Sequence, residues 1–163
     1  MGASRPGGVQ WMTAGCGIIH SEMPEQLEGE MSGFQLWVNL PAAKKMCVPR
    51  YQNLEPDAVP LVRNADGVEV RVVAGEVDGV QGPVNGIPSE PTYLDVTLAP
   101  GAIFSSNLPL GHTAFAYVFQ GQAMIGNDKA ERDHLAVLSD GDQVRVSSAE
   151  GGRLILVAGK PIG

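Results

Sequence analysis

Short runs in which apolar and polar residues alternate are the feature that most restricts the fold of this chain. Valines alternate with charged residues over 68–72, and residues 94–98 read Leu-Asp-Val-Thr-Leu. A period of two puts one set of side chains on one face of a strand, which is typical of antiparallel strands with one buried face. The chain also holds 21 glycines and 12 prolines, spread along its length, so turns are frequent. The pattern predicts an all-β sandwich, jelly roll or barrel.

Signals for helices and for a division of the chain are weaker. Only "PAAKKM" and "AERDHLAV" contain good helix formers, and each is long enough for one or two turns at most. Residues 48–60 contain three prolines and little alternation, so we expect a connector there. Before it, three candidate strands lie around Trp11, Ile19 and Leu36, while residues 61–158 contain enough strands to close a barrel.

Charge and cysteine content exclude several classes of protein. The net charge is −7, with 11 Lys and Arg against 18 Asp and Glu, so there is no basic stripe and we expect no direct nucleic-acid binding. No apolar stretch has secretory or membrane-spanning length, so we expect a cytoplasmic protein without membrane contact. Cys16 and Cys47 lack zinc-site spacing and are expected to be small, buried or half-buried thiols in a reduced setting.

His20 and Glu22 form a candidate pair of metal ligands. Residues two positions apart on a strand point to the same side, so an imidazole nitrogen and a carboxylate oxygen can converge on one ion. A catalytic metal site needs about three protein ligands, however. The other histidines offer no replacement, because His112 and His134 are expected to be an exposed turn residue and a half-buried strand residue.

Other motifs predict turns and no catalytic group. Asp140 and Asp142 flank a glycine without the acidic residues that complete a calcium loop, so a tight turn is expected. The glycine-rich residues 75–86 lack the Lys and the helix of a phosphate site. No serine, histidine and acid arrangement can be assigned, so we name no catalytic residue.

Longer stretches of the sequence resemble a known family. The segments "PGGVQWMTAGCGIIHSEMPE", "GFQLWVNLPAAKKMCVPRYQ" and "YLDVTLAPGAIFSSNLPLGHTAFAYVFQGQAMIG" are similar to the pirin family of bicupins. The resemblance implies two cupins in tandem, each a double-stranded β-helix or jelly-roll barrel, with one metal, usually iron, in the first. In that family a His-x-His pair and the His and Glu of an "HSE" segment hold the metal, so the resemblance assigns His20 and Glu22 to the second pair.

The resemblance also predicts how the chain is divided. Residues 1–54 would be a remnant of the first, metal-site cupin, and residues 55–163 the complete second cupin. The His-x-His motif is absent from this sequence, and the ending "GKPIG" stops short of the family's usual extension, so we expect a chain truncated at both ends. Two interpretations of His20 and Glu22 are equally favoured. The pair is either a hydrogen-bonded remnant of the family's site or a weak site for iron or another divalent metal whose remaining ligands are partly water.

Two functions follow from the resemblance. The favoured one is a binding or regulatory module that acts through a protein partner without a complete metal site. The alternative is a metal-dependent dioxygenase of the quercetin 2,3-dioxygenase type, with His20 as a ligand and Glu22 as a ligand or proton acceptor. We also expect a homodimer, because the N-terminal strands would leave open edges and an apolar face bearing Trp11 and Leu36.

Overall fold

The computed structural model describes residues 5–21, 29 and 32–163 of the chain. In chain order its strands are β1 (Val9–Thr13), β2 (Arg50–Leu54), β3 (Leu61–Arg63), β4 (Val68–Ala74), β5 (Glu76–Val77), β6 (Val80–Gln81), β7 (Thr92–Leu98), β8 (Ile103–Asn107), β9 (Thr113–Ile125), β10 (Asp128–Glu131), β11 (His134–Val137), β12 (Gln143–Ser147) and β13 (Gly152–Gly159). Its helices are two single 3-10 turns, η1 (Ala42–Lys44) and η2 (Pro56–Ala58). Within the described residues no helix is long and apolar enough to cross a membrane. The all-β prediction is confirmed.

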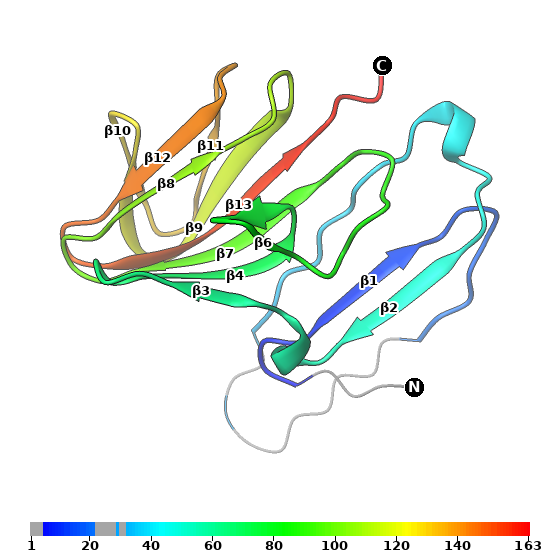
Figure 1. Ribbon diagram of the computed structural model, residues 1–163, viewed down its shortest axis with the longest axis horizontal. Coiled ribbons are helices and arrows are strands. Elements are labelled where there is room, and N and C mark those ends of the chain that lie inside the picture. The colour runs from blue at the N-terminus through cyan, green and yellow to red at the C-terminus, as the bar shows by residue number, and fades with distance from the viewer. Residues whose placement is uncertain (1–4, 22–28, 30–31) are drawn as a thin grey trace.

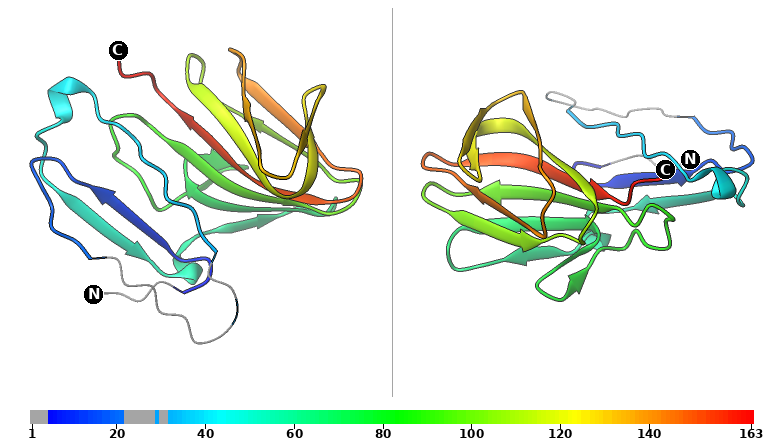
Figure 2. Two further views of the ribbon diagram at one scale, coloured as in Figure 1. Left: turned by 180° about the vertical axis from the view of Figure 1, so that it is seen from behind. Right: turned by 90° about the horizontal axis from the view of Figure 1, so that it is seen from above.

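A nine-stranded antiparallel sheet forms the body of the molecule (Figure 1). Its main path runs β3-β4-β7-β13-β9-β12-β8, and β10 and β11 also pair with β9. The sheet curls on itself, so that β8 and β12 face β4 and β7 across a core of buried Val, Leu, Ala, Ile and Phe side chains (Figures 1 and 2). This one core holds the residues that the alternating runs had predicted to be buried.

The runs in which apolar and polar residues alternate form strands with one buried face, as predicted. In β4 the three valines at 68, 70 and 72 are buried, and in β7 Leu94, Val96 and Leu98 are buried while Asp95 and Thr97 are less so. β13 lies between β7 and β9 and is almost wholly apolar, because both of its faces are covered. Polar residues of β7 and β13 that point outward pair with each other: Arg153 Nε donates to Asp95 Oδ1 at 2.8 Å, and a second guanidinium nitrogen donates to the other carboxylate oxygen.

A two-stranded ribbon of β1 and β2 lies beside the curled sheet (Figure 2). Val9, Trp11 and Leu54 of the ribbon pack, together with Tyr93, against a second cluster of Val59, Val73, Ala74, Val84 and Ile87. Burial, and the nearby Asp95 carboxylate, raise the pKa of the Tyr93 hydroxyl. The expected connector at 48–60 is therefore wrong in part, because its residues 50–54 are the strand that completes the ribbon. The proposed boundary between residues 54 and 55 stays a prediction.

The segment 32–40 contains no strand, although its apolar residues had predicted one. Phe34 instead packs edge-on against the outer face of β9, with ring centroids 4.8 Å from Phe119 and 5.8 Å from Tyr117. The guanidinium carbon of Arg153 lies 5.2 Å from the Phe119 centroid. Aromatic contacts of Phe34 with a face of the sheet help to hold this segment.

Neither of the two stretches rich in helix formers contains an α-helix. "PAAKKM" forms only the 3-10 turn η1. "AERDHLAV" spans the end of β10 and all of β11, with Asp133 in a left-handed conformation between them. The helix-forming residues there are overruled because both strands pair with the long strand β9.

The first prediction concerns the core of the curled sheet. Leu94 is completely buried in β7, so Leu94→Ala should lower the free energy of unfolding by about 3 kcal/mol through lost transfer energy and a cavity. Leu110 is 77% exposed, so Leu110→Ala should change it by less than about 0.5 kcal/mol. Urea unfolding followed by circular dichroism measures both. Equal effects of the two substitutions would contradict this core.

Candidate functional site

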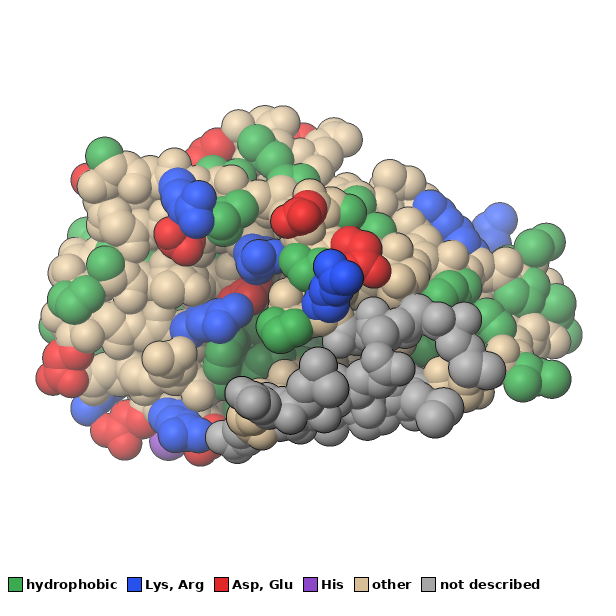
Figure 3. Space-filling model, turned by 90° about the horizontal axis from the view of Figure 1, so that it is seen from below, with side chains coloured by type: hydrophobic (Ala, Val, Ile, Leu, Met, Phe, Trp, Pro, Cys, Tyr) green, Lys and Arg blue, Asp and Glu red, His purple; other side chains and the backbone are tan. Residues whose placement is uncertain are grey.

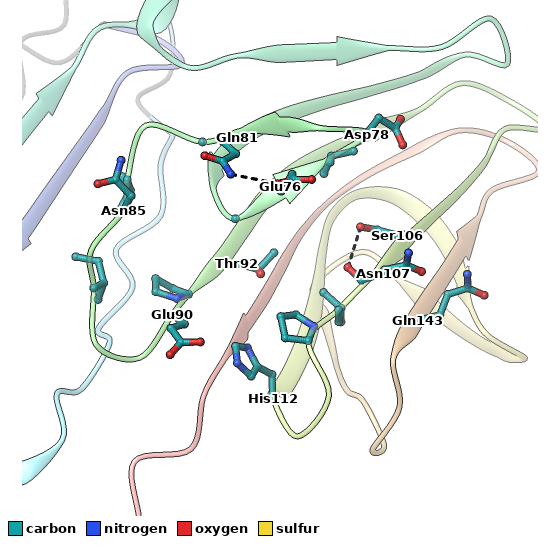
Figure 4. A pocket seen from close by; sticks show the side chains of 18 of the residues that line it. Glu76, Asp78, Gln81, Asn85, Glu90, Thr92, Ser106, Asn107, His112 and Gln143 are labelled. Carbon is teal, nitrogen blue, oxygen red and sulfur yellow. Dashed lines mark hydrogen bonds between the residues drawn. The ribbon is translucent and has the colours of Figure 1, made fainter.

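A cavity of about 890 Å3 opens at the end of the curled sheet where β7 begins and β8 ends (Figure 4). We call it the mouth cavity. The β5–β6 hairpin and the loop 84–91 form one wall, and the end of β8 with Gln143 of β12 forms the opposite wall. Cavities in the mouths of β-barrels are a common location for small-molecule sites.

Local sequence explains the wall made by the hairpin. Asp78 and Gly79 both have positive φ, 49° and 79°, as a two-residue turn between strands of the natural twist requires. The turn places Glu76 opposite Gln81, and the Gln81 amide donates to the Glu76 carboxylate at 3.3 Å. The Asp-Gly pair is a strong hairpin signal in the sequence. The glycine-rich stretch 75–86 thus shapes a cavity wall without being a phosphate loop.

The mouth cavity is lined by uncharged polar groups, by carboxylates and by apolar side chains such as Val77, Ile87 and Leu108. Among the described residues that line it, none is Lys or Arg. Its carboxylates are Glu76, Asp78 and Glu90, and its amide and hydroxyl side chains are Gln81, Asn85, Thr92, Ser105, Ser106, Asn107 and Gln143. Cations lie only outside the lining: Lys160 Nζ is 3.4 Å from Glu90 Oε1, and an Arg50 nitrogen donates to the Asn85 carbonyl at 2.8 Å. The lining offers many hydrogen-bond acceptors and no fixed positive charge.

His112 stands beside Glu90 at one side of the mouth cavity (Figure 4). It follows a turn, as expected, but is half-buried instead of exposed, and its Nδ1 is buried without a hydrogen-bond partner among the described residues. His134 was expected to be a half-buried strand residue. It is the first residue of strand β11, but it is exposed. Its Nδ1 lies 3.2 Å from the carbonyl oxygens of Glu131 and Arg132.

The predicted metal pair is placed only in part. His20 follows β1 in an extended segment that is not a strand, and it is exposed. Glu22 lies outside the described residues. Across 5–21, 29 and 32–163, no three His, Cys, Asp or Glu side chains gather closely enough to hold a metal ion. The described residues alone do not fit the ligand set that a catalytic metal requires.

Sequence reasoning missed the mouth cavity because its polar residues come from four separate segments. Glu76, Glu90, Asn107 and Gln143 share no motif, and only the folding of the sheet brings their segments together. The Asp-Gly turn at 78 and 79 could have placed the hairpin, but it could not have placed the opposite wall. His112 was read as an isolated turn residue for the same reason.

Comparison with known proteins identifies both parts of the chain. Residues 1–38 match the family described as Pirin, and residues 93–163 match the Pirin C-terminal cupin domain. A putative quercetin 2,3-dioxygenase of Pseudomonas aeruginosa is 44% identical over 168 residues, which cover 99% of this chain and 59% of that protein. Pirin of Homo sapiens is also 44% identical, over 99% of this chain and 57% of its own length.

Solved structures agree with the fold. A structure from Geobacillus kaustophilus superposes with a TM-score of 0.83 at 34% identity, covering 96% of this chain and 64% of that one. A quercetin 2,3-dioxygenase of Acinetobacter baumannii gives 0.80 at 25% identity, covering 96% and 57%. The chain therefore spans less than two thirds of the length of these relatives. The predicted cupin fold is confirmed, and the chain belongs to the pirin family.

Proposed function

We propose that this chain is a ligand-binding cupin module whose site is the mouth cavity. The observation that carries the proposal is the lining itself: amide, hydroxyl and carboxylate groups of two facing walls border one open cavity. Such a site can bind and orient a small molecule without a metal ion. This function is a specific form of the binding or regulatory role expected from the sequence. Binding of the ligand would be the signal that the module passes to a protein partner.

The charge of the lining selects the class of ligand. The lining has three carboxylates, one of them paired with Lys160 from outside, and no cation, so its net negative charge disfavours phosphates and carboxylates. Hydroxyl groups, in contrast, donate to carboxylate and amide oxygens such as those of Glu90 and Asn107. We therefore propose a neutral, hydroxyl-rich small molecule. Quercetin, which the names of several relatives mention, is a polyphenol of this class and a suitable probe.

Gln143 and Gln120 provide a matched test of this site. Both glutamines are exposed on strands, but only Gln143 lines the mouth cavity. Gln143→Leu should weaken quercetin binding about two- to tenfold, the value of one lost hydrogen bond, whereas Gln120→Leu should leave it unchanged. Isothermal titration calorimetry measures the dissociation constants, with citrate as an anion that should not bind. Equal losses in both variants, or no binding by the unaltered chain, would contradict the proposal.

A dioxygenase is the second candidate function, and the names of the relatives from Pseudomonas aeruginosa and Vibrio cholerae favour it. It would use His20 and Glu22 toward a divalent metal such as iron. We rank it second because no three His, Cys, Asp or Glu side chains of the described residues gather into the preorganised site that metal catalysis needs.

Metal loading separates the two candidates. After incubation with Fe(II), Ni(II) or Mn(II) and desalting, we expect far less than one ion per chain by elemental analysis, and no consumption of oxygen with quercetin. If an ion is retained, both His20→Ala and Glu22→Ala should abolish its binding without unfolding the chain. One ion per chain together with quercetin turnover would overturn our order of preference.

We further propose that the N-terminal part mediates self-association. The exposed fractions of Ile19, Trp37 and Val48 are 102%, 89% and 84%, and hydrophobic side chains gather at the end of the molecule that carries β1 and β2 (Figure 3). Among the described residues, β1 and β2 form a two-stranded sheet of their own beside the curled sheet. A symmetric dimer is the simplest closed assembly that covers such a surface.

Light scattering at micromolar concentration tests the dimer. The unaltered chain should have twice the monomer mass, and Trp37→Ser should shift the equilibrium toward monomer because it removes the largest exposed apolar side chain of the segment. Leu110→Ser is the control, since Leu110 is comparably exposed but lies in a turn of the curled sheet. A monodisperse monomer at all concentrations would show that the proposed dimer does not form.

A further inference from the structure

Cys16 and Cys47 lie just beyond the same end of the ribbon, Cys16 after β1 and Cys47 before β2. The β1–β2 ladder pairs Val9 with Leu54 and ends with Thr13 opposite Arg50. Cys16 lies three positions after Thr13, and Cys47 lies three positions before Arg50. Continuing the antiparallel register therefore puts the two cysteines directly opposite each other.

The backbone confirms that the two cysteines are neighbours. The amide of Cys16 donates to the carbonyl of Cys47 at 3.0 Å. Residues opposite each other in an antiparallel pair have Cα atoms roughly 4.5–5.5 Å apart, within the roughly 4.4–6.8 Å that disulfides span. The Cys47 amide donates to the Lys44 carbonyl at 3.1 Å, so a single backbone hydrogen bond joins the two cysteines beyond the last ladder pair.

The surroundings bring the chain segments close and leave a thiol accessible. A Cβ added to Gly15 would lie 3.3 Å from Cys47 Sγ, and Gly15 has a positive φ of 52°, so a glycine lets the two backbones approach. Both thiols are free. The expectation that both are at least half-buried is wrong for Cys16, which is exposed, while Cys47 is half-buried.

We propose that Cys16 and Cys47 form a reversible intramolecular disulfide, a modification site at the open end of the ribbon. With hydrogen peroxide as the oxidant, the exposed Cys16 thiolate attacks one oxygen, becomes a sulfenic acid and releases one water. The Cys47 thiolate then attacks the Cys16 sulfur, the S–S bond forms and a second water leaves. Two thiols lose two protons and two electrons, and the peroxide is reduced to two waters.

The bond would change the part of the chain that carries the most exposed apolar residues. It closes a loop over 16–47, which contains His20 and Trp37. Beyond the last ladder pair, a backbone hydrogen bond between the two cysteines holds this end of the ribbon. A disulfide between the same residues would fix it covalently. Oxidation would thus alter the presentation of the surface proposed for self-association, while the mouth cavity lies in the curled sheet and is not cross-linked.

Peroxide titration of the full chain tests the disulfide. Treated with one equivalent of hydrogen peroxide at low micromolar concentration, the chain should lose both thiols together and lose the mass of two hydrogens. Peptide mapping should find a Cys16–Cys47 cross-link within one chain, and dithiothreitol should restore both thiols. Gain of oxygen mass without a cross-link, or disulfides only between chains, would overturn the proposal.

A shifted thiol gives the matched control. Cys47 lies in the bend before β2 and is half-buried, whereas Val48 is exposed, so Cys47→Ser combined with Val48→Cys moves the thiol one position along the chain and out to the surface with little effect on packing. This variant should form at least tenfold less intramolecular cross-link than the unaltered chain. Equal cross-linking would show that chain flexibility, and not the register of the ribbon, brings the thiols together.

Discussion

The pairing of β13 with both β7 and β9 is the constraint on which the rest of the curled sheet depends. Leu154 and Leu156 of β13 are completely buried, and hydrogen bonds run from this strand to both neighbours. β3 and β4 join the sheet through β7, whereas β8, β10, β11 and β12 join it directly or indirectly through β9. Without β13 the sheet would separate into two small pieces, neither with a covered apolar face.

The two proposed sites lie at the margins of this sheet and depend on it to different degrees. The mouth cavity needs the full curl, because one wall adjoins β4 and β7 while the opposite wall comes from β8 and β12 at the end of the sheet path. The ribbon and its cysteines need only local pairing and the small cluster around Trp11 and Val73. Binding in the cavity and oxidation of the ribbon are therefore expected to be separable properties.

The sequence predicted the fold where side-chain burial decides it. Residues 68–72 and 94–98 alternate because one face of each strand meets the core, so their pattern is legible without any knowledge of partners. Strand β2 was missed because the prolines around it resemble a connector, and its pairing with β1 depends on a residue about forty positions away in the chain. The helix signal of "AERDHLAV" failed since pairing with β9 outweighs local propensity.

Site residues were harder to predict than strands. His20 and Glu22 could be named from the sequence because they lie in one motif, and their role stays a prediction, whereas the mouth cavity combines segments whose spacing carries no signal. The burial of His112 and His134 was predicted in reverse because burial of a turn residue depends on what the fold places above it. The cysteine pair became visible only with the register of β1 and β2, since 16 and 47 have no spacing rule of their own.

Native-state hydrogen exchange of the backbone amides tests the central role of β13 most directly. Amides of β13 and of the adjoining parts of β7 and β9 should exchange most slowly, through global unfolding, while those of β1 and β2 exchange faster through local opening. Slow exchange in the ribbon, with β13 exchanging as fast as or faster than β1 and β2, would contradict this dependence.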